Sequence, residues 1–195
     1  MSNGRLLVDG PAPGVARLTI SNPEKRGALD SAILDAFAST IPELEARCVL
    51  ITGEDASFSA GYDLGGLAGE KLAEQAEKLI AHPFTAAIEA IEDYPYPTLA
   101  ALNGHTIGGG LELALSCDLR LAADDITLGM PPAKLGLVYS HTGIRKFIDT
   151  VGAPRTRELF LVGRSIDAPT AREWGLVNAL AEPERLAEQA LELAT

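Results

Sequence analysis

The chain has 195 residues, 47% of them hydrophobic and 22% charged, which is enough for one globular domain with a buried core. Its formal net charge of -11 makes nucleic acid a poor partner, although a local basic patch can still bind an anionic small molecule. The longest apolar runs, such as Leu111 to Leu115, are too short to cross a bilayer, and the N-terminal residues lack the apolar core of a secretory signal.

The cysteines and histidines give no metal-binding pattern. Cys48 and Cys117 have neither metal-ligand spacing nor a CxxC arrangement, and the three histidines lack ligand spacing with one another or with carboxylates. We therefore expect no metal, reduced thiols and a cytoplasmic protein. His105 is expected to bond locally, and His82 to cap a helix that begins at Pro83.

The first strand and helix follow turn and capping signals. Residues 15–20 alternate like a strand, and the "GPAPG" of residues 10–14 reads as a turn. Asp30 or Ser31 is a candidate cap for a helix that runs toward Thr40.

Two apolar runs, residues 47–53 and 98–104, are typical of strands buried on both faces. The residues between them predict a helical stretch from about 70 to 93, in which Pro83 opens a second helix. Strand, helix and strand in this order predict a right-handed parallel crossover, and hence an α/β fold.

The second half of the chain continues the same alternation. A buried helix over residues 111–117 is followed by strands, by a helix between Asp167 and Gly175, and by a last helical stretch. The remaining strands are expected at residues 119–124, 126–130 and 176–180, and the last helix from residue 183 onward.

Three consecutive glycines, Gly108 to Gly110, stand at the start of the helix that carries Glu112. Bare backbone N–H groups at a helix N-terminus suit an anion or a developing oxyanion. The alternative is that the glycines let the helix pack tightly on a strand. No phosphate-loop motif and no GxSxG nucleophile elbow occurs in the sequence.

A second loop has the same character. Ala60 and Gly61 follow a buried strand and precede Tyr62 and Asp63. Two loops that leave neighbouring parallel strands at their carboxyl ends can offer two convergent N–H donors, which is the arrangement of an oxyanion hole.

Glu112 is a lone carboxyl group among leucines and alanines. The start of a helix favours its ionised form, whereas burial favours the protonated form. That opposition can hold a carboxyl group ready to exchange a proton at neutral pH. The alternative is a structural glutamate bonded to backbone donors.

Three stretches, "SFSAGYDL", "NGHTIGGGLELALSCDLRLAA" and "GRSIDAPTAREWGLVN", resemble the crotonase superfamily, the enoyl-CoA hydratases, isomerases and related acyl-CoA enzymes. The resemblance runs from about Val15 to Glu184. It implies a single domain over residues 1–195, with a crotonase-like ββα spiral core of parallel sheets flanked by helices. It also implies an acyl-CoA substrate without a further cofactor, and a homo-oligomer that is a trimer or a dimer of trimers.

The resemblance also assigns roles to residues. The oxyanion-hole N–H groups belong to Tyr62 and Gly109, and Glu112 matches the first of two catalytic glutamates and is expected to face the same cavity. Coenzyme A binding is implied for a set of residues in the two loops: Lys25, Arg26, Ala28, Ala60, Asp63 and Leu64.

The second catalytic glutamate is replaced by Pro132, which has no side-chain proton to exchange. The segment that contains Tyr139 is similar to that of methylmalonyl-CoA decarboxylase-like members, although those tend to have histidine where this chain has Tyr62. His141, placed in a loop, is an alternative acid or merely polar surface.

These features favour an acyl-CoA lyase or isomerase that works through a thioester enolate, with decarboxylation or isomerisation preferred to hydration. The alternative is a crotonase-fold protein that binds acyl-CoA without turnover. A peptidase of the Clp type is set aside because no matching Ser/His/Asp arrangement occurs, and Ser116 reads as core.

Family members continue beyond the position of Thr195 with a further helical module. The apolar side of the last helix, formed by Leu186, Ala190 and Leu191, is therefore expected to lack a partner in its own chain, so that the helix either lies near a subunit contact or is poorly ordered.

Overall fold

The computed structural model describes residues 4–65, 74 and 80–195, and the strands of this part of the chain form two sheets. The larger sheet has the order β1-β2-β3-β5-β7-β10, with strands Arg5–Ala12 (β1), Val15–Ser21 (β2), Cys48–Gly53 (β3), Thr98–Leu102 (β5), Leu119–Ala123 (β7) and Ala179–Ala181 (β10). The smaller sheet has the order β4-β6-β8-β9, with strands Ser57–Ser59 (β4), His105–Ile107 (β6), Thr127–Gly129 (β8) and Ile166–Asp167 (β9).

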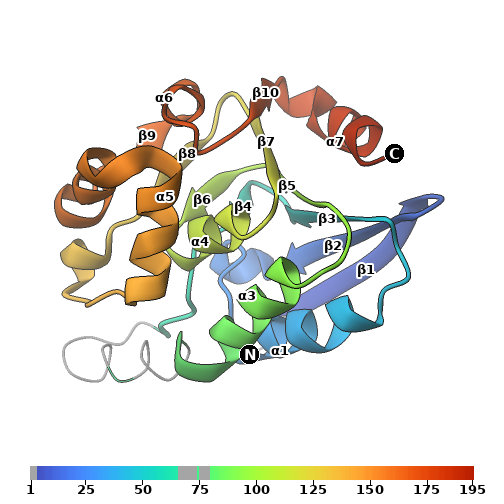
Figure 1. Ribbon diagram of the computed structural model, residues 1–195, viewed down its shortest axis with the longest axis horizontal. Helices are drawn as coiled ribbons and strands as arrows, with labels where there is room; N and C mark the ends of the chain where they lie inside the picture. Colours follow the sequence, from blue (N-terminus) through green and yellow to red (C-terminus); the bar gives the residue numbers. More distant parts are fainter. Residues whose placement is uncertain (1–3, 66–73, 75–79) are drawn as a thin grey trace.

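The helices connect these strands and cover the sheets (Figure 1). The α-helices are Ser31–Thr40 (α1), Thr85–Glu92 (α3), Gly109–Leu115 (α4), His141–Arg157 (α5), Ala168–Trp174 (α6) and Leu186–Ala194 (α7). Shorter helical turns are Pro23–Lys25 (η1), Ile41–Glu43 (η2), Ile80–Phe84 (η3), Pro132–Leu135 (η4), Glu158–Val162 (η5) and Pro183–Arg185 (η6).

The larger sheet is parallel except at its edge. β2, β3, β5, β7 and β10 pair in parallel, whereas β1 pairs with β2 as an antiparallel hairpin. β3 and β5 are neighbours joined through α3, so the predicted parallel crossover is confirmed. Every residue of β5 is buried, as expected for a strand covered on both faces. The predicted fold class, parallel sheets flanked by helices, is confirmed.

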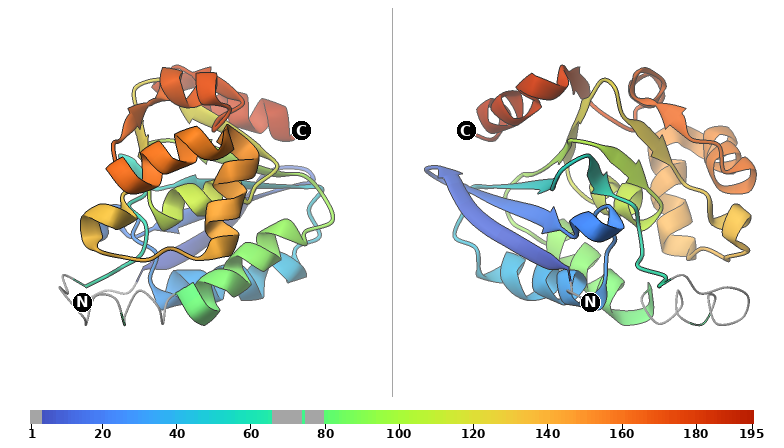
Figure 2. Two further views of the ribbon diagram at one scale, coloured as in Figure 1. Left: turned by 60° about the vertical axis from the view of Figure 1, so that its left-hand side comes forward. Right: turned by 180° about the vertical axis from the view of Figure 1, so that it is seen from behind.

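Helices pack on both sides of the larger sheet (Figures 1 and 2): α1 and α3 lie side by side on one side, and α7 lies on the other. α1 begins at Ser31 because the Asp30 carboxylate accepts a hydrogen bond from the Ile33 N–H at 3.0 Å, which confirms the first of the two candidate caps. Ile33, Leu34 and Phe37 then form its fully buried face.

Strand β1 was not predicted, because its residues do not alternate between apolar and polar. Leu7 and Val8 are 43% and 48% exposed, and β1 pairs with β2 alone in the described part of the sheet. Residues 10–12, which read as part of a turn, belong to this strand, and the turn is confined to residues 13–14.

The prediction of a helix opened by Pro83 is wrong. Pro83 lies inside the π-helical turn η3, which runs directly into α3, and the N-cap residue of α3 is Phe84 without a side-chain capping bond. His82 is therefore exposed within η3 instead of capping a helix. Of the helix expected from about residue 70, residues 70–73 and 75–79 lie outside the described part of the chain.

Helix α7 also differs from expectation, because it packs on its own chain. Leu186 is 3% exposed and Ala190 is fully buried, and α7 contacts β3, β5 and β7. This packing could not be recognised from the sequence, because the strands that contact α7 lie far away along the chain.

Helix α5 was not assigned at all. A backbone break at Gly152, with φ of 78°, and Pro154 inside the helix interrupt its sequence pattern.

None of the helices in the described residues is long and apolar enough to cross a membrane.

Candidate active site

The two glycine-containing loops follow strands β4 and β6, which pair in parallel in the smaller sheet. The sequence pattern predicted that these loops directly follow the long apolar strands, which the structure shows as β3 and β5. That assignment is wrong because each long strand ends several residues earlier, and a three-residue strand too short to show alternation follows it. The expectation that the two loops leave adjacent parallel strands is nevertheless confirmed, because β4 and β6 are such strands.

The backbone near Tyr62 is fixed on one side by Leu29. The Leu29 N–H donates to the Gly61 carbonyl at 2.7 Å, and the Asp63 N–H donates to the Leu29 carbonyl at 2.9 Å. Because successive N–H groups of an extended chain point to opposite sides, the Tyr62 N–H points away from Leu29.

The other loop meets this backbone at the first turn of α4. A Cβ atom on Gly61 would lie 3.1 Å from the Gly109 nitrogen, so the two loops are in contact. Within the described part of the chain, the N–H groups of Tyr62 and Gly109 donate no hydrogen bond. Their convergence on one substrate oxygen stays a prediction.

The glycines also serve packing, so both explanations offered for them apply. Gly108 adopts a φ of 58°, which turns the chain into α4. A Cβ on Gly109 would lie 2.6 Å from the Tyr62 ring, and one on Gly110 would lie 2.5 Å from the Ser59 Cβ.

Glu112 is bonded to a tyrosine that comes from a distant segment. Its side chain lies on α4 and is 5% exposed, and the Tyr139 hydroxyl donates a hydrogen bond to its Oε2. The hydroxyl groups of Tyr62 and Tyr139 lie 3.2 Å apart. A Cβ on Gly143 would lie 2.7 Å from the Glu112 Oε1, so this glycine allows α5 to approach so closely. Three proton-carrying side chains are thereby connected.

The buried environment raises the pKa of all three of these side chains. Burial raises the pKa of Tyr62 and of Tyr139 above the ordinary value for a phenol, and for both the nearby Glu112 acts in the same direction. Burial also raises the pKa of Glu112, while the hydrogen bond from Tyr139 and the charge of Lys146 lower it, and Glu92 raises it. The predicted effect of burial on Glu112 is therefore present, but the influences that favour the ionised form come from Tyr139 and Lys146, whereas the sequence had suggested the start of the helix.

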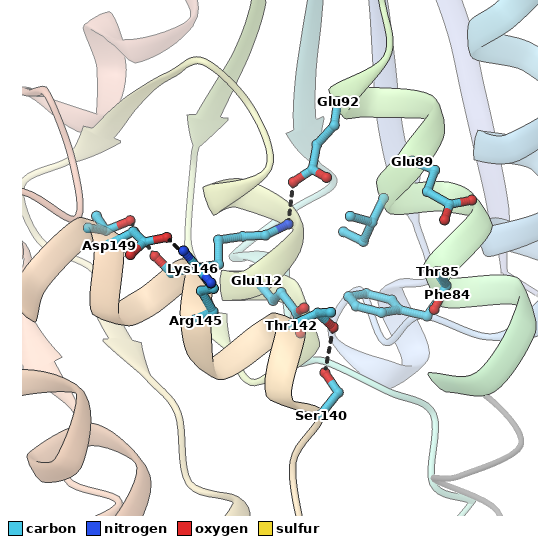
Figure 3. Close-up of a pocket in the computed structure, with 12 residues that line it drawn as sticks. Phe84, Thr85, Glu89, Glu92, Glu112, Ser140, Thr142, Arg145, Lys146 and Asp149 are labelled. Atoms are coloured by element: carbon cyan, nitrogen blue, oxygen red, sulfur yellow. Dashed lines mark hydrogen bonds and ion pairs between the residues drawn. The ribbon is translucent and has the colours of Figure 1, made fainter. Parts of the chain in front are cut away.

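Glu112 lies on the wall of a cavity of about 550 Å³ between α3 and α5 (Figure 3). The two glycine loops instead line a second cavity of about 70 Å³, together with Pro132 and Tyr139. Among the cavities that the described residues line, Glu112 and the two glycine loops belong to different ones, so a cavity shared by Glu112 and the two amides stays a prediction. Tyr139 lies between them, since it lines the smaller cavity and bonds the carboxyl group on the wall of the larger one.

Pro132 and His141 differ in how they relate to the site. Pro132, the residue expected at the position of the second glutamate, is buried in η4 and lines the smaller cavity beside the two glycine loops. His141 is the first residue of α5, not part of a loop, and it is exposed and lines neither cavity.

The residues expected to bind coenzyme A come together. The loop of residues 25–29 runs beside that of residues 60–64, and the Ala60 N–H donates to the Arg26 carbonyl at 3.0 Å. The Lys25 ammonium pairs with the Asp63 carboxylate at 2.6 Å, which raises the Lys25 pKa.

The other members of this set lie in the same place. Ala28 is buried, Arg26 is exposed, and Ala60 and Leu64 line the smaller cavity. Their binding role stays a proposal.

Two further predictions concern local bonding. His105 Nδ1 lies 2.9 Å from the Thr127 hydroxyl, so its local role is confirmed. Ser116 is buried, as expected, but it also accepts a hydrogen bond from Lys146, which the sequence did not reveal.

Among the residues that the structure describes, no group of three or more His, Cys, Asp or Glu side chains is placed to hold a metal ion.

Parallel sheets flanked by helices, with two glycine loops in contact beside a buried glutamate, define a member of the crotonase superfamily. Residues 11–195 match the family model for enoyl-CoA hydratase/isomerase. The chain belongs to the enoyl-CoA hydratase/isomerase family.

Relatives of known sequence and structure agree. A Bacillus subtilis protein named "Probable enoyl-CoA hydratase" is 37% identical over 87% of this chain and 67% of its own length. The crystal structure of an enoyl-CoA hydratase from Bacillus anthracis superposes with a TM-score of 0.88 at 31% identity, over 97% of this chain and 74% of that one. A monofunctional enoyl-CoA isomerase from M. smegmatis gives a TM-score of 0.81 at 29% identity, over 97% of this chain and 82% of that one.

Proposed function

We propose that this protein is an acyl-CoA lyase or isomerase that forms a thioester enolate, and that decarboxylation or double-bond isomerisation is its reaction in preference to hydration. The observation that carries the proposal is the hydrogen bond from Tyr139 to Glu112 beside Pro132. Hydration by two carboxyl groups needs a second acid or base where this chain has a proline ring. One carboxyl group connected to a phenol is sufficient to move a single proton.

The carbonyl oxygen of the thioester accepts hydrogen bonds from the N–H groups of Tyr62 and Gly109. These donors stabilise the negative charge that develops on this oxygen when the enolate forms. The loops that hold Lys25 and Asp63 bind the coenzyme A portion, where the basic side chains of Lys25 and Arg26 suit its phosphates.

Tyr139 and Glu112 then act as one proton-transfer unit. In isomerisation, the unit accepts a proton from one carbon of the acyl group and returns it to another, so no atom is gained or lost. In decarboxylation, the electron pair of the broken C–C bond becomes the enolate, carbon dioxide leaves, and the unit supplies one proton to the carbon. We assign the Tyr139 hydroxyl as the group that meets the substrate, because Tyr139 lines the smaller cavity together with the two glycine loops.

The assembly and location complete the proposal. We propose a homo-oligomer, a trimer or a dimer of trimers, in the cytoplasm. Large apolar side chains that remain exposed on the single chain, such as Val138 (95%) and Leu161 (71%), suit burial by a neighbouring subunit.

A panel of enoyl-CoA, methylmalonyl-CoA and malonyl-CoA thioesters tests the reaction class, with Glu112→Gln as the matched control. The proposal is supported if the unaltered chain turns over a methylmalonyl, malonyl or positional-isomer substrate and the Glu112→Gln variant does not. Efficient hydration of an enoyl-CoA would contradict the preferred reaction. Tight acyl-CoA binding with no turnover of any substrate would favour the non-catalytic binding protein instead.

A further inference from the structure

Lys146 connects three helices at the wall of the larger cavity. It extends from α5 toward α3, where its ammonium group pairs with the Glu92 carboxylate (Figure 3). The same Nζ donates a hydrogen bond to the Ser116 hydroxyl at 2.6 Å, just beyond α4. Its side chain is 18% exposed, so water screens this charge less than it screens a surface lysine.

The hydrogen bonds run in one direction from Lys146 to the backbone of Glu112. The Ser116 hydroxyl has a single proton, which it donates to the Glu112 carbonyl at 3.0 Å. Ser116 therefore accepts from Lys146 and cannot donate to it. Lys146 is therefore the hydrogen-bond donor, and through Ser116 it is connected to the backbone of Glu112, whose carboxyl group lines the same cavity.

Other titratable and charged groups face Glu112 from the elements packed against it. Tyr62 and Tyr139 reach it as neutral phenols, and Glu92 on α3 opposes its ionisation. Glu89 and Asp149 also line the cavity, and Arg145 pairs with Asp149 at 3.5 Å while its side chain is 81% exposed. Among the described residues, Lys146 is the cation that acts on Glu112.

We propose that Lys146 is a positioning residue that sets the pH range in which Glu112 exchanges its proton, by holding a positive charge in the same cavity and anchoring the Glu112 backbone through Ser116. This rests on the proposed function, in which Glu112 and Tyr139 move the proton. Glu92 balances the effect, because its carboxylate partly neutralises the ammonium group.

The sign of the effect follows from the charges. A positive charge favours the ionised carboxylate, so removal of the ammonium group raises the pKa of Glu112. Removal of the Glu92 carboxylate has the opposite sign, because Glu92 raises the pKa of Glu112. Two substitutions at one ion pair should therefore move the same titration in opposite directions.

The test compares Lys146→Met, Lys146→Arg and Glu92→Gln, with Arg145→Met as a control that removes a neighbouring cation from the same cavity. Two quantities are measured in the full chain. One is the pH dependence of kcat. The other is the infrared band of the protonated Glu112 carboxyl, assigned by its loss in Glu112→Gln. The infrared titration needs no turnover, so it tests this inference even if the proposed reaction is wrong.

We expect the infrared midpoint to move to higher pH in Lys146→Met and to lower pH in Glu92→Gln. The limb of the kcat profile that Glu112 sets, acid for isomerisation and alkaline for decarboxylation, should move in the same directions. Lys146→Arg should restore the midpoint, and Arg145→Met should leave it unchanged. If Lys146→Met lowered activity equally at every pH with an unchanged infrared midpoint, Lys146 would be a structural tie and the inference would be wrong. Equal shifts in Lys146→Met and Arg145→Met would also overturn it, because the effect would then be that of overall charge.

Discussion

The hydroxyl of Tyr139 donates a hydrogen bond to the carboxylate of Glu112, although the two residues are 27 positions apart and belong to different segments. Glu112 lies on α4 behind the glycine loop, and Tyr139 lies just before α5 at the smaller cavity. The bond connects a buried carboxyl group to the cavity that the two glycine loops line. It is the structural basis of the proposed proton transfer.

Tyr139→Phe should abolish this connection while the fold is kept, because the ring still packs against Phe160 and only the hydroxyl is lost. We expect kcat to fall by about 10²-fold, within the range found for loss of a general acid or base, with KM nearly unchanged. Steady-state kinetics on the substrate found by the thioester panel provides the measurement. Tyr62→Phe is the matched control, because the hydroxyl that it removes lies 3.2 Å from the Tyr139 hydroxyl, one step further from the carboxyl group, and its loss should cost less. A larger loss in Tyr62→Phe would reverse the assigned roles.

Gly143→Ala should disturb the site although it removes no side-chain group that takes part in the proposed chemistry. The added Cβ would lie 2.7 Å from the Glu112 Oε1 and 2.7 Å from the Tyr139 Cε1, so α5 must move away or the bond between these side chains must break. We expect a stability loss of about 1–3 kcal/mol, as for other overpacked sites, together with a fall in kcat. Denaturant unfolding and kinetics report the two effects. Gly10→Ala is the control, because its Cβ would have no neighbour closer than 3.7 Å. A fully active Gly143→Ala variant would show that the close approach of α5 is not needed.

Glu112→Gln should stabilise the protein at neutral pH. Burial raises the folded-state pKa of Glu112, so the native state favours the protonated carboxyl group. The stability that this group contributes is present below its unfolded pKa and is lost as the pH rises through the folded pKa. The neutral amide avoids that loss.

Thermal unfolding followed from pH 4 to pH 8 tests this prediction. The Tm of Glu112→Gln should exceed that of the unaltered chain by a few degrees at neutral pH, since about 1 kcal/mol corresponds to about 2–4 °C in a protein of this size. The difference should shrink toward acid pH. A difference that is constant over the range would mean that Glu112 titrates alike in both states.

The chain is expected to self-associate, but the apolar face of α7 does not provide the reason. The apolar face of α7 was expected to need a neighbouring subunit, but Leu186 and Ala190 are buried by the chain's own sheet. Exposed Leu161 and Val162, on η5, now provide the argument for a subunit contact. Light scattering at micromolar concentration should give a mass well above 20.5 kDa. A monomer at that concentration would contradict the proposed trimer, and Leu161→Asp should lower the mass if η5 forms the contact.

Much of the fold was predictable from continuous patterns. β3 and β5 were found because apolar runs of five or six residues are typical of strands buried on both faces. The helix that begins at Ser31 was found because Asp30 is a strong capping residue. Strands β4 and β6 were missed because three residues cannot show a period, and the two glycine loops were therefore attached to the wrong sheet.

The site was only partly predictable, for a related reason. Glu112 stood out because a carboxyl group among leucines needs a partner, but the sequence could not show that the partner is Tyr139 or that the two occupy different cavities. Lys146 was not noticed at all. Its role depends on the approach of α5 to α3 and α4, which Gly143 permits and which no local pattern records.

The central claim is that this protein forms a thioester enolate by means of Glu112 and Tyr139, and hydrogen–deuterium exchange tests it without knowledge of the natural acyl group. A series of acyl-CoA thioesters is incubated with the protein in D₂O, and deuterium at the carbon next to the carbonyl is followed by NMR. We predict exchange well above the buffer rate with at least one thioester, and its loss in both Glu112→Gln and Tyr139→Phe, while acyl-CoA binding measured by calorimetry is kept. Exchange at the buffer rate for every thioester that binds, or unchanged exchange in Glu112→Gln, would contradict the account.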